Sequence, residues 1–343
     1  MKEQQKYRKR ALRLSPVQYQ RKIGSMIEEN VTLRKSLDLD KLIPLLPQAE
    51  DINYWRELNP NLTISERPFE GFSQLSGIQK AEIDEYRLQL REEGYFQTPS
   101  VIPAATIQEM RDCIENVREA GFPTMFALVY DIFYQVFGYF NSSLTGILGN
   151  GYKLVPNFWV YYIETSDSGK GFEPHRDAEY ENTIDSNGMP TVLTIWVTIT
   201  EANPLNSCMY MVPANRDPEY AEAIRNLKTK ATKFALEDIR ALPTQAGTLS
   251  CWDQYVFHWG SRSSSRAKSP RISYAVYCQR GDIPPVDDVI VDIPSVLDFP
   301  TRLSLICRGS YRYSYASLQP SPQAEALLNF LRKHTTALKK KLI

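Results

Sequence analysis

Two of the three histidines in the chain stand where they could share a metal ion with a carboxylate. His175 is followed two residues later by Asp177, and His258 lies further along the chain. Two imidazoles and one carboxylate on one face of a metal are the ligand set of mononuclear non-haem iron sites, and they leave other coordination positions open. A histidine two residues before an acidic residue is common by chance, so the spacing alone is weak evidence. The surrounding segments decide whether the prediction is strong.

A polar pair, Arg271 and Ser273, follows the second histidine in a segment with the alternation of a β-strand. The residues between and after them, at 272, 274 and 276, are apolar, so the segment has one polar and one apolar face. Side chains two apart on a strand point the same way, which would bring this pair into one cavity, and likewise His175 and Asp177. A guanidinium with a neighbouring hydroxyl suits one carboxylate of a dicarboxylate such as 2-oxoglutarate. The alternative is an arginine paired with an internal aspartate.

Five other segments occur in a recognisable order: LREEGYF at 90–96, SVIP at 100–103, TIWVTIT at 194–200, NSCM at 206–209 and GTLSCWD at 247–253. With the histidine and arginine motifs, they make residues 80–285 resemble the phytanoyl-CoA dioxygenase-type branch of the iron(II)- and 2-oxoglutarate-dependent oxygenases. The chain departs from the family pattern at Ser207, where the family has glycine, and at Trp259, which separates His258 from Gly260. These departures alter a turn and the mouth of the pocket.

The resemblance implies a mainly β fold with flanking helices, a double-stranded β-helix or jelly roll. It also implies that His175, Asp177 and His258 hold Fe(II), and that Arg271 and Ser273 hold 2-oxoglutarate as the cosubstrate. With O2 as the other reactant, such an enzyme hydroxylates a substrate and releases succinate and carbon dioxide. Because Asp177 retains its carboxylate, the site resembles the hydroxylases rather than the halogenating relatives. Desaturation and ring formation stay open.

Further residues are predicted around this centre. Side chains on neighbouring predicted strands are expected to line the cosubstrate pocket: Thr194, Trp196 and Asn157. Side chains expected near the substrate are Trp159, Tyr161, Glu179 and Trp259. Ordinary sheet packing is an equally good interpretation of the aromatic ones. The charged segment 178–189 directly follows the ligands and is a candidate lid.

The chain divides into three predicted regions: an accessory segment at 1–80 with a helix at 18–35, a dioxygenase domain at 81–285, and a C-terminal extension at 286–343 that ends in a basic helix. Within the domain we expect a helix at 105–119, a helix or strand at 125–140, a strand at 154–164, and then strands and turns from 190 to 280 with a helix near 218–232. His334 lies among basic residues, which would repel a metal ion, so we expect it to face solvent.

Composition agrees with a soluble enzyme. The 343 residues are 43% hydrophobic, and 40 basic residues balance 40 acidic ones, so no electrostatic footprint for nucleic acid is present. No apolar run approaches the roughly 18 residues of a membrane-spanning helix, so no membrane insertion is expected. The five cysteines are scattered and are expected to be reduced and mostly buried, as in a cytoplasmic protein. We expect a monomer or homodimer that acts on a small molecule, such as a secondary metabolite.

Two other classes of protein remain as alternatives. A His–Asp–His trio with open positions also suits a zinc hydrolase, in which a metal-bound water attacks the substrate. Hydrolysis has no use for the Arg271 and Ser273 pair, which argues against this class. A jelly-roll binding protein without catalysis is the second alternative, and the intact ligand set argues against it.

Overall fold

The computed structural model describes residues 38–65, 80–167, 171–231, 233–292, 297–314 and 318–342, so the helix predicted at 18–35 lies outside the described part. The strands described there form two antiparallel sheets, of order β1-β6-β3-β8-β2-β9 and β5-β4-β7. The larger sheet contains β1 (Tyr95–Ser100), β2 (Lys153–Ile163), β3 (Val192–Thr198), β6 (Thr248–Asp253), β8 (Arg271–Gln279) and β9 (Val291–Asp292). The smaller sheet contains β4 (Met209–Val212), β5 (Arg240–Leu242) and β7 (Phe257–Gly260).

Side-chain alternation gives the larger sheet a core face and a site face. On β8, Ile272, Tyr274 and Val276 belong to the main hydrophobic core, while Arg271 and Tyr277 line a cavity on the opposite face. This is the alternation predicted from the sequence, and β2 and β3 repeat it. The larger sheet therefore rests one face on the core and turns the other towards the smaller sheet and the cavity.

Helices cover the core face. The longer ones are α7 (Lys80–Glu93), α8 (Ala104–Glu119), α12 (Phe299–Ser314) and α13 (Pro322–Leu342). Shorter helices are α4 (Leu39–Leu42), η1 (Ile43–Leu45), α5 (Leu46–Ala49), α6 (Ile52–Leu58), η3 (Thr124–Val129), α9 (Ile132–Gln135), η4 (Val136–Phe140), α10 (Asn141–Leu148), η5 (Ala214–Arg216), α11 (Tyr220–Asn226) and η6 (Leu236–Asp238). The described chain thus combines antiparallel sheets with helices, and the flanking helices that were expected are present.

Several predicted elements are confirmed, and others differ. The helix at 105–119 is α8 and the strand at 154–164 is β2. Residues 125–140 form the short helices η3, α9 and η4 rather than a strand, because nearly every side chain there is buried and supplies no two-residue alternation. Phe133 and Phe137 of this segment pack on Tyr274 of the sheet, as predicted. The helix near 218–232 is shorter, since the chain turns into the left-handed region at Leu227. All five cysteines are buried and free, as predicted.

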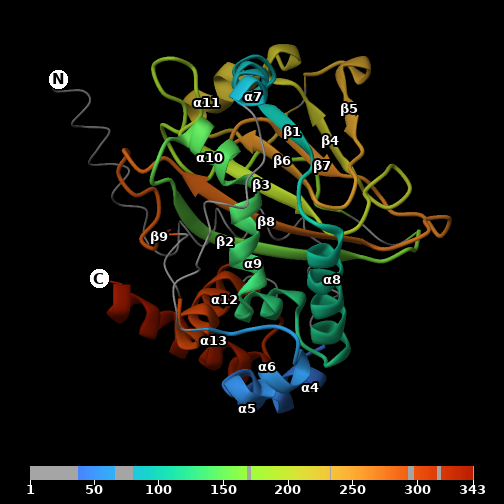
Figure 1. Ribbon diagram of the computed structural model, residues 1–343, viewed down its shortest axis with the longest axis vertical. Helices are drawn as coiled ribbons and strands as arrows, with labels where there is room; N and C mark the ends of the chain where they lie inside the picture. Colours follow the sequence, from blue (N-terminus) through green and yellow to red (C-terminus); the bar gives the residue numbers. More distant parts are fainter. Residues whose placement is uncertain are drawn as a thin grey trace.

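The C-terminal extension packs onto the core. Figure 1 shows α12 and α13 beside the short N-terminal helices, on the side of the molecule away from the smaller sheet. The sequence analysis missed α12, whose buried Arg302 lies 2.6 Å from Asp131 and donates to the carbonyl of Val129.

The prediction that His334 faces solvent is wrong. Its side chain is only 13% exposed and lies 2.9 Å from a carboxylate oxygen of Glu50. None of the helices in the described ranges combines the length and hydropathy needed to cross a bilayer.

Candidate metal centre and its cavity

His175 and His258 are brought together by a direct backbone pairing. Each backbone N–H donates to the other residue's carbonyl, at 3.0 and 2.9 Å, and the two imidazole centroids are 4.3 Å apart. The pairing continues to Gly260, whose N–H donates to the carbonyl of Phe172. A Cβ on Gly260 would lie 2.7 Å from the Cα of Gly171, so only glycine permits this approach. The two metal-ligand candidates thus face each other across neighbouring extended segments.

Asp177 completes the group. One of its carboxylate oxygens, Oδ1, lies 3.5 Å from Nε2 of His175 and 3.9 Å from Nε2 of His258. The three candidate ligand atoms lie within 4.8 Å of one another. The predicted ligand strand is an isolated bridge at His175 rather than a regular strand, and Ala178 turns the chain away with φ +37°. Strain of this kind at a non-glycine residue is frequent beside functional groups.

Both histidines have the tautomer that a metal ligand needs. Nδ1 of His175 is 2.7 Å from the carbonyl of Glu173, and Nδ1 of His258 is 3.0 Å from the carbonyl of Val256. A carbonyl oxygen only accepts, so each Nδ1 carries the proton and each Nε2 presents a lone pair to the centre. Burial, followed by the neighbouring His175, lowers the pKa of His258 to about 4, which keeps this imidazole neutral.

The other oxygen of Asp177, Oδ2, is held by two donors. The indole N–H of Trp252 donates to it at 3.0 Å, and the hydroxyl of Thr194 donates at 2.5 Å. The amide of Gln254 donates in turn to the Thr194 hydroxyl at 3.2 Å. Burial opposes ionisation of Asp177, but His258, His175 and Thr194 together hold its pKa below the usual value. Thr194 lines the cavity as predicted, and its hydroxyl donates to the metal-ligand carboxylate.

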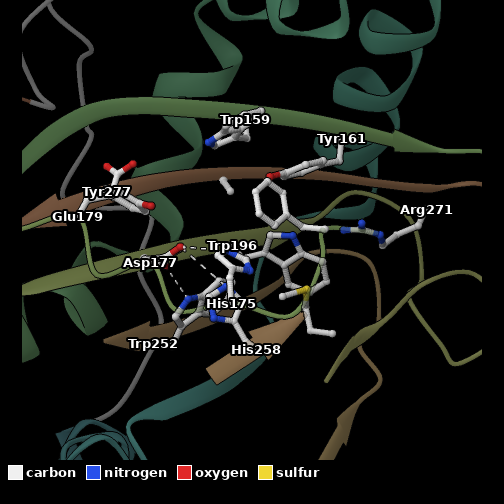
Figure 2. A pocket seen from close by; sticks show the side chains of 14 residues that line it. Trp159, Tyr161, His175, Asp177, Glu179, Trp196, Trp252, His258, Arg271 and Tyr277 are labelled. Carbon is white, nitrogen blue, oxygen red and sulfur yellow. Dashed lines mark hydrogen bonds and ion pairs between the residues drawn. The ribbon is translucent and has the colours of Figure 1, made fainter. Parts of the chain in front are cut away.

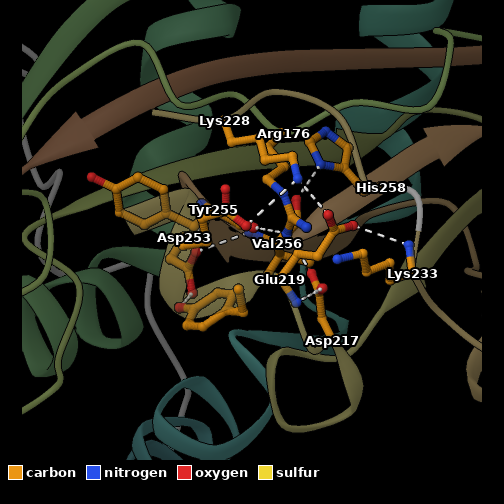
Figure 3. Close-up of polar contacts among 11 residues, drawn as sticks. Arg176, Asp217, Glu219, Lys228, Lys233, Asp253, Tyr255, Val256 and His258 are labelled. Atoms are coloured by element: carbon orange, nitrogen blue, oxygen red, sulfur yellow. Dashed lines mark hydrogen bonds and ion pairs between the residues drawn. The ribbon is translucent and has the colours of Figure 1, made fainter. Parts of the chain in front are cut away.

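Arg176 points the opposite way from its two neighbours and anchors the ligand segment. It is fully buried, and its Nη1 donates to Asp217 at 2.5 Å and to the carbonyl of Tyr255 at 2.6 Å. Figure 3 shows this guanidinium among polar groups, near His258. In the same view, Tyr255 donates its backbone N–H to buried Asp253. The alternation of the sequence therefore separates a cavity side from an anchoring side.

Arg271 enters the same cavity from β8. Its side chain is buried and lies between the rings of Tyr161 and Trp196, with 5.6 and 5.5 Å from Cζ to the ring centroids. Nη1 donates to the hydroxyl of Ser273 at 2.8 Å, and Nε has no hydrogen-bond partner. Burial lowers its pKa to about 10. In the described part of the chain no carboxylate pairs with Arg271. The alternative interpretation, in which this arginine pairs with an internal aspartate, is therefore not observed there.

The cavity lies between the metal-ligand group and aromatic walls and is partly open to solvent. Its lining contains most of the predicted residues: His175, Asp177, His258, Arg271, Thr194, Trp196, Trp159, Tyr161 and Glu179. Figure 2 shows Arg271 and Glu179 on opposite sides of the three candidate ligands. The sequence analysis did not assign five further lining residues to the site: Phe172, Met209, Trp252, Ala275 and Tyr277. The period of two along β8 could have found Ala275 and Tyr277, since both share the face of Arg271.

Three residues predicted at the site do not line the cavity. Asn157 is buried and donates to Glu179 at 2.8 Å, so it supports a wall residue instead of forming the wall. Ser273 is covered and accepts from Arg271. Trp259 stacks on Tyr210 outside the lining, because residues 258 and 259 alternate on β7 and only His258 turns inward.

Ser207, which stands where the family pattern has glycine, adopts the turn conformation that glycine would adopt. Ser207 has φ +74°, a conformation that favours glycine. Its hydroxyl donates to the carbonyl of Ser261 at 2.6 Å, which offsets part of the strain. The substitution therefore leaves the turn in place.

A comparison with known protein families gives a match that includes the candidate metal ligands. Residues 138–272 match the family model described as phytanoyl-CoA dioxygenase (PhyH), a range that contains His175, Asp177, His258 and Arg271. No curated protein matched the chain. The resemblance predicted from the sequence is confirmed over these residues.

Similar solved structures have low identity. HygX from Streptomyces hygroscopicus with nickel and 2-oxoglutarate bound is 11% identical, with 60% of this chain and 89% of that chain covered and a TM-score of 0.44. The epimerase SnoN in complex with Fe3+, alpha ketoglutarate and nogalamycin RO is 16% identical, with 59% of this chain and 84% of that chain covered and a TM-score of 0.43. The non-heme monooxygenase ThoJ–Ni complex is 15% identical, with 74% of this chain and 97% of that chain covered and a TM-score of 0.46. Likeness at this level does not define the reaction of the present chain.

The family match and the His–Asp–His group fall in the same part of the chain. Residues 138–272 are similar to a phytanoyl-CoA dioxygenase domain, and the same range contains a His–Asp–His group with the donor types of a mononuclear non-haem iron site. Together they indicate an enzyme of the non-haem iron, 2-oxoglutarate-dependent type.

Proposed function

We propose that the protein uses Fe(II), 2-oxoglutarate and O2 to hydroxylate, or otherwise oxidise, an unactivated C–H bond of a small organic metabolite. One observation carries the proposal: a metal-ligand group and a buried guanidinium without a carboxylate partner share one cavity in the described part of the chain. A buried arginine of this kind is costly unless a ligand supplies the missing anion. A dicarboxylate that reaches from the metal to Arg271 would supply it.

The residues fit the proposed groups. His175 and His258 would bind Fe(II) through Nε2, and Asp177 through Oδ1, because these atoms converge while the other donors of each side chain are engaged. Arg271 would bind the distal carboxylate of 2-oxoglutarate, with its plane kept in place by two aromatic rings. When bound, iron, cosubstrate and O2 would supply the oxidising power, with succinate and carbon dioxide as co-products.

The chain contributes positioning and exclusion of water. Trp252 and Thr194 fix the rotation of the Asp177 carboxylate, so that one oxygen is directed to the metal position. The aromatic walls, which include Trp159 and Trp196, remove water from the space beside the centre and leave an apolar surface for a substrate. Asp177 would also occupy the position that a halide needs, which favours hydroxylation over halogenation.

The test is anaerobic addition of Fe(II) and 2-oxoglutarate to purified metal-free protein. We expect a visible charge-transfer absorbance that requires both additions, followed, on admission of air, by conversion of 2-oxoglutarate to succinate. Tight Zn(II) binding with no effect of 2-oxoglutarate would instead favour the hydrolase, and absence of metal binding would favour a non-catalytic binding protein.

Some finer predictions belong with this proposal. The two antiparallel sheets with the cavity between them support a double-stranded β-helix for residues 81–285, and the segment 178–189 stays a candidate lid. The role of residues 1–80 and 286–343 as accessory segments, a cytoplasmic location, and a monomeric or homodimeric state stay predictions.

A further inference from the structure

Glu179 is the one charged wall residue that the proposed function leaves without a role. Among the residues that line the cavity, the charged ones are the ligand group, Arg271 and Glu179. If 2-oxoglutarate occupies Arg271, only Glu179 remains to meet a charged group on the prime substrate. Figure 2 shows its carboxylate across the metal-ligand group from Arg271, next to Tyr277. Glu179 therefore faces the half of the cavity that the cosubstrate would leave open.

The structure holds this carboxylate in a fixed position. Asn157 on β2 donates to its Oε2 at 2.8 Å, and Arg312 on α12 lies 3.3 Å from the same oxygen. The Glu179 side chain is only 13% exposed, so these two contacts keep its carboxylate at the cavity wall. Neither Asn157 nor Arg312 lines the cavity, which means that an entering molecule would meet Glu179 and not its supports.

Among the described residues, a network of ion pairs surrounds Glu179. Arg312 is shared with Asp287 at 3.4 Å, and Arg308 contacts both Asp287 and Asp288. Of these residues, only Glu179 lines the cavity, so an entering molecule would meet its carboxylate and not the guanidinium groups. A carboxylate repels an anionic substrate and attracts a cationic one.

We propose that Glu179 binds the ammonium group of an amine-bearing prime substrate whose apolar body lies against the aromatic walls. The walls beside it, including Trp159 and Tyr277, offer ring faces that also favour a cation. The proposal rests on the proposed function, because it requires 2-oxoglutarate to occupy Arg271. It makes an acyl-CoA or another polyanion a poor substrate.

The test uses probes that differ in charge and share a body: tryptamine against indole-3-propionate, and phenethylamine against 3-phenylpropionate. Binding to wild-type protein loaded with Zn(II), which is diamagnetic and does not consume O2, is followed by ligand-observed NMR with and without 2-oxoglutarate. With 2-oxoglutarate present, we expect each amine to bind about tenfold more tightly than its acid. Equal binding of amine and acid, or no binding of either amine, would overturn the proposal independently of any variant.

Three variants separate recognition from a structural ion pair. Glu179→Gln should weaken amine binding about tenfold and remove the preference for amines. Glu181→Gln, at an exposed position on the same segment, should bind as the wild type does. Arg312→Gln removes the supporting cation and keeps the carboxylate, so amine binding should be retained or strengthened. An equal loss in the Glu179 and Arg312 variants would mean that the pair only holds α12, and it would overturn the proposal.

The comparison of binding with and without 2-oxoglutarate tests the proposed function separately. Without cosubstrate, the acids can reach Arg271, and addition of 2-oxoglutarate should displace them while leaving the amines bound. Failure of 2-oxoglutarate to bind or to displace the acids would contradict the proposed function, while the amine data would still decide the role of Glu179.

Discussion

Trp252 donates its indole N–H to Oδ2 of Asp177 at 3.0 Å, and this leaves Oδ1 of the same carboxylate facing the two histidines. The contact links β6 of the larger sheet to the segment that carries two of the three candidate metal ligands. It makes the orientation of the anionic ligand depend on a residue that would not itself bind the metal.

Replacing Trp252 by Phe should weaken Fe(II) binding by about tenfold to a hundredfold, as is usual for residues that orient metal ligands. The phenyl ring keeps most of the packing but cannot donate to Asp177. Titration with Fe(II) under argon measures the change, and Thr194→Val should act in the same direction. Trp259→Phe, on the smaller sheet and outside the cavity, is the control and should bind metal normally. Unchanged affinity in Trp252→Phe would show that the hydrogen bond does not position the carboxylate.

His258→Ala should lose both metal retention and turnover of 2-oxoglutarate, because two ligands rarely hold a mononuclear iron site. Metal content after gel filtration and succinate production are the two measurements. His334→Ala is the matched control, since that histidine contacts Glu50 far from the cavity. Normal iron content in His258→Ala would contradict the ligand assignment.

Arg271→Met should raise the dissociation constant for 2-oxoglutarate by about ten- to a hundredfold, which corresponds to the roughly 1.5 to 3 kcal/mol of a charge-assisted contact. The variant keeps an apolar stem between Tyr161 and Trp196 and removes the guanidinium. Binding is followed by the charge-transfer absorbance, and Fe(II) affinity without cosubstrate should stay within about threefold of the wild type. If 2-oxoglutarate binds equally well, Arg271 is not its anchor.

Asp253 should make stability depend on pH. Burial raises its pKa from 3.8 to about 6, although Tyr220 and two backbone N–H groups donate to it. Between about pH 4 and pH 6 the unfolded chain releases this proton while the folded chain keeps it, so the free energy of unfolding falls as the pH rises. The expected fall is on the order of 3 kcal/mol and is complete above about pH 6.

Asp253→Asn should remove this component. Urea unfolding of the metal-free protein from pH 4 to 7.5 measures it, as the difference between the pH profiles of variant and wild type. Asp112→Asn, at an exposed position on α8, should leave the profile unchanged. Parallel profiles for the wild type and the Asp253 variant would show that this carboxyl does not retain its proton in the folded state.

Gly260→Ala should disrupt the metal centre. The added methyl would lie 2.7 Å from the Cα of Gly171 and 3.1 Å from the backbone nitrogen of Phe172, so the backbones that pair His175 with His258 must separate. We expect weaker metal binding and a loss of about 1 to 3 kcal/mol in unfolding free energy. Gly309→Ala on α12 is the control, because its methyl would meet only the flexible end of Met125. A fully stable Gly260→Ala protein with normal metal binding would exclude the close approach.

The sequence determined the chemistry through residue types and local spacing. The period of two placed Arg271 on the cavity face of β8 and Ile272 on the core face, because a strand directs alternate side chains to opposite sides. Likewise, His175 and Asp177 could be assigned to one site from their types and spacing. The departure at Ser207 was visible as a missing glycine, and the φ of +74° confirms that this turn position favours glycine.

Tertiary structure decided which distant residues support that chemistry. Trp252 reaches Asp177 from 75 positions away in the sequence, and Arg312 reaches Glu179 from 133 positions away, and neither pairing has a local signal. Asn157 was placed on the correct strand, but its contact with Glu179 and the stacking of Trp259 on Tyr210 depend on which neighbours cover these side chains. Short-range periodicity fixes the direction of a side chain, whereas its partner is set by the pairing of strands and helices that only the folded chain brings together.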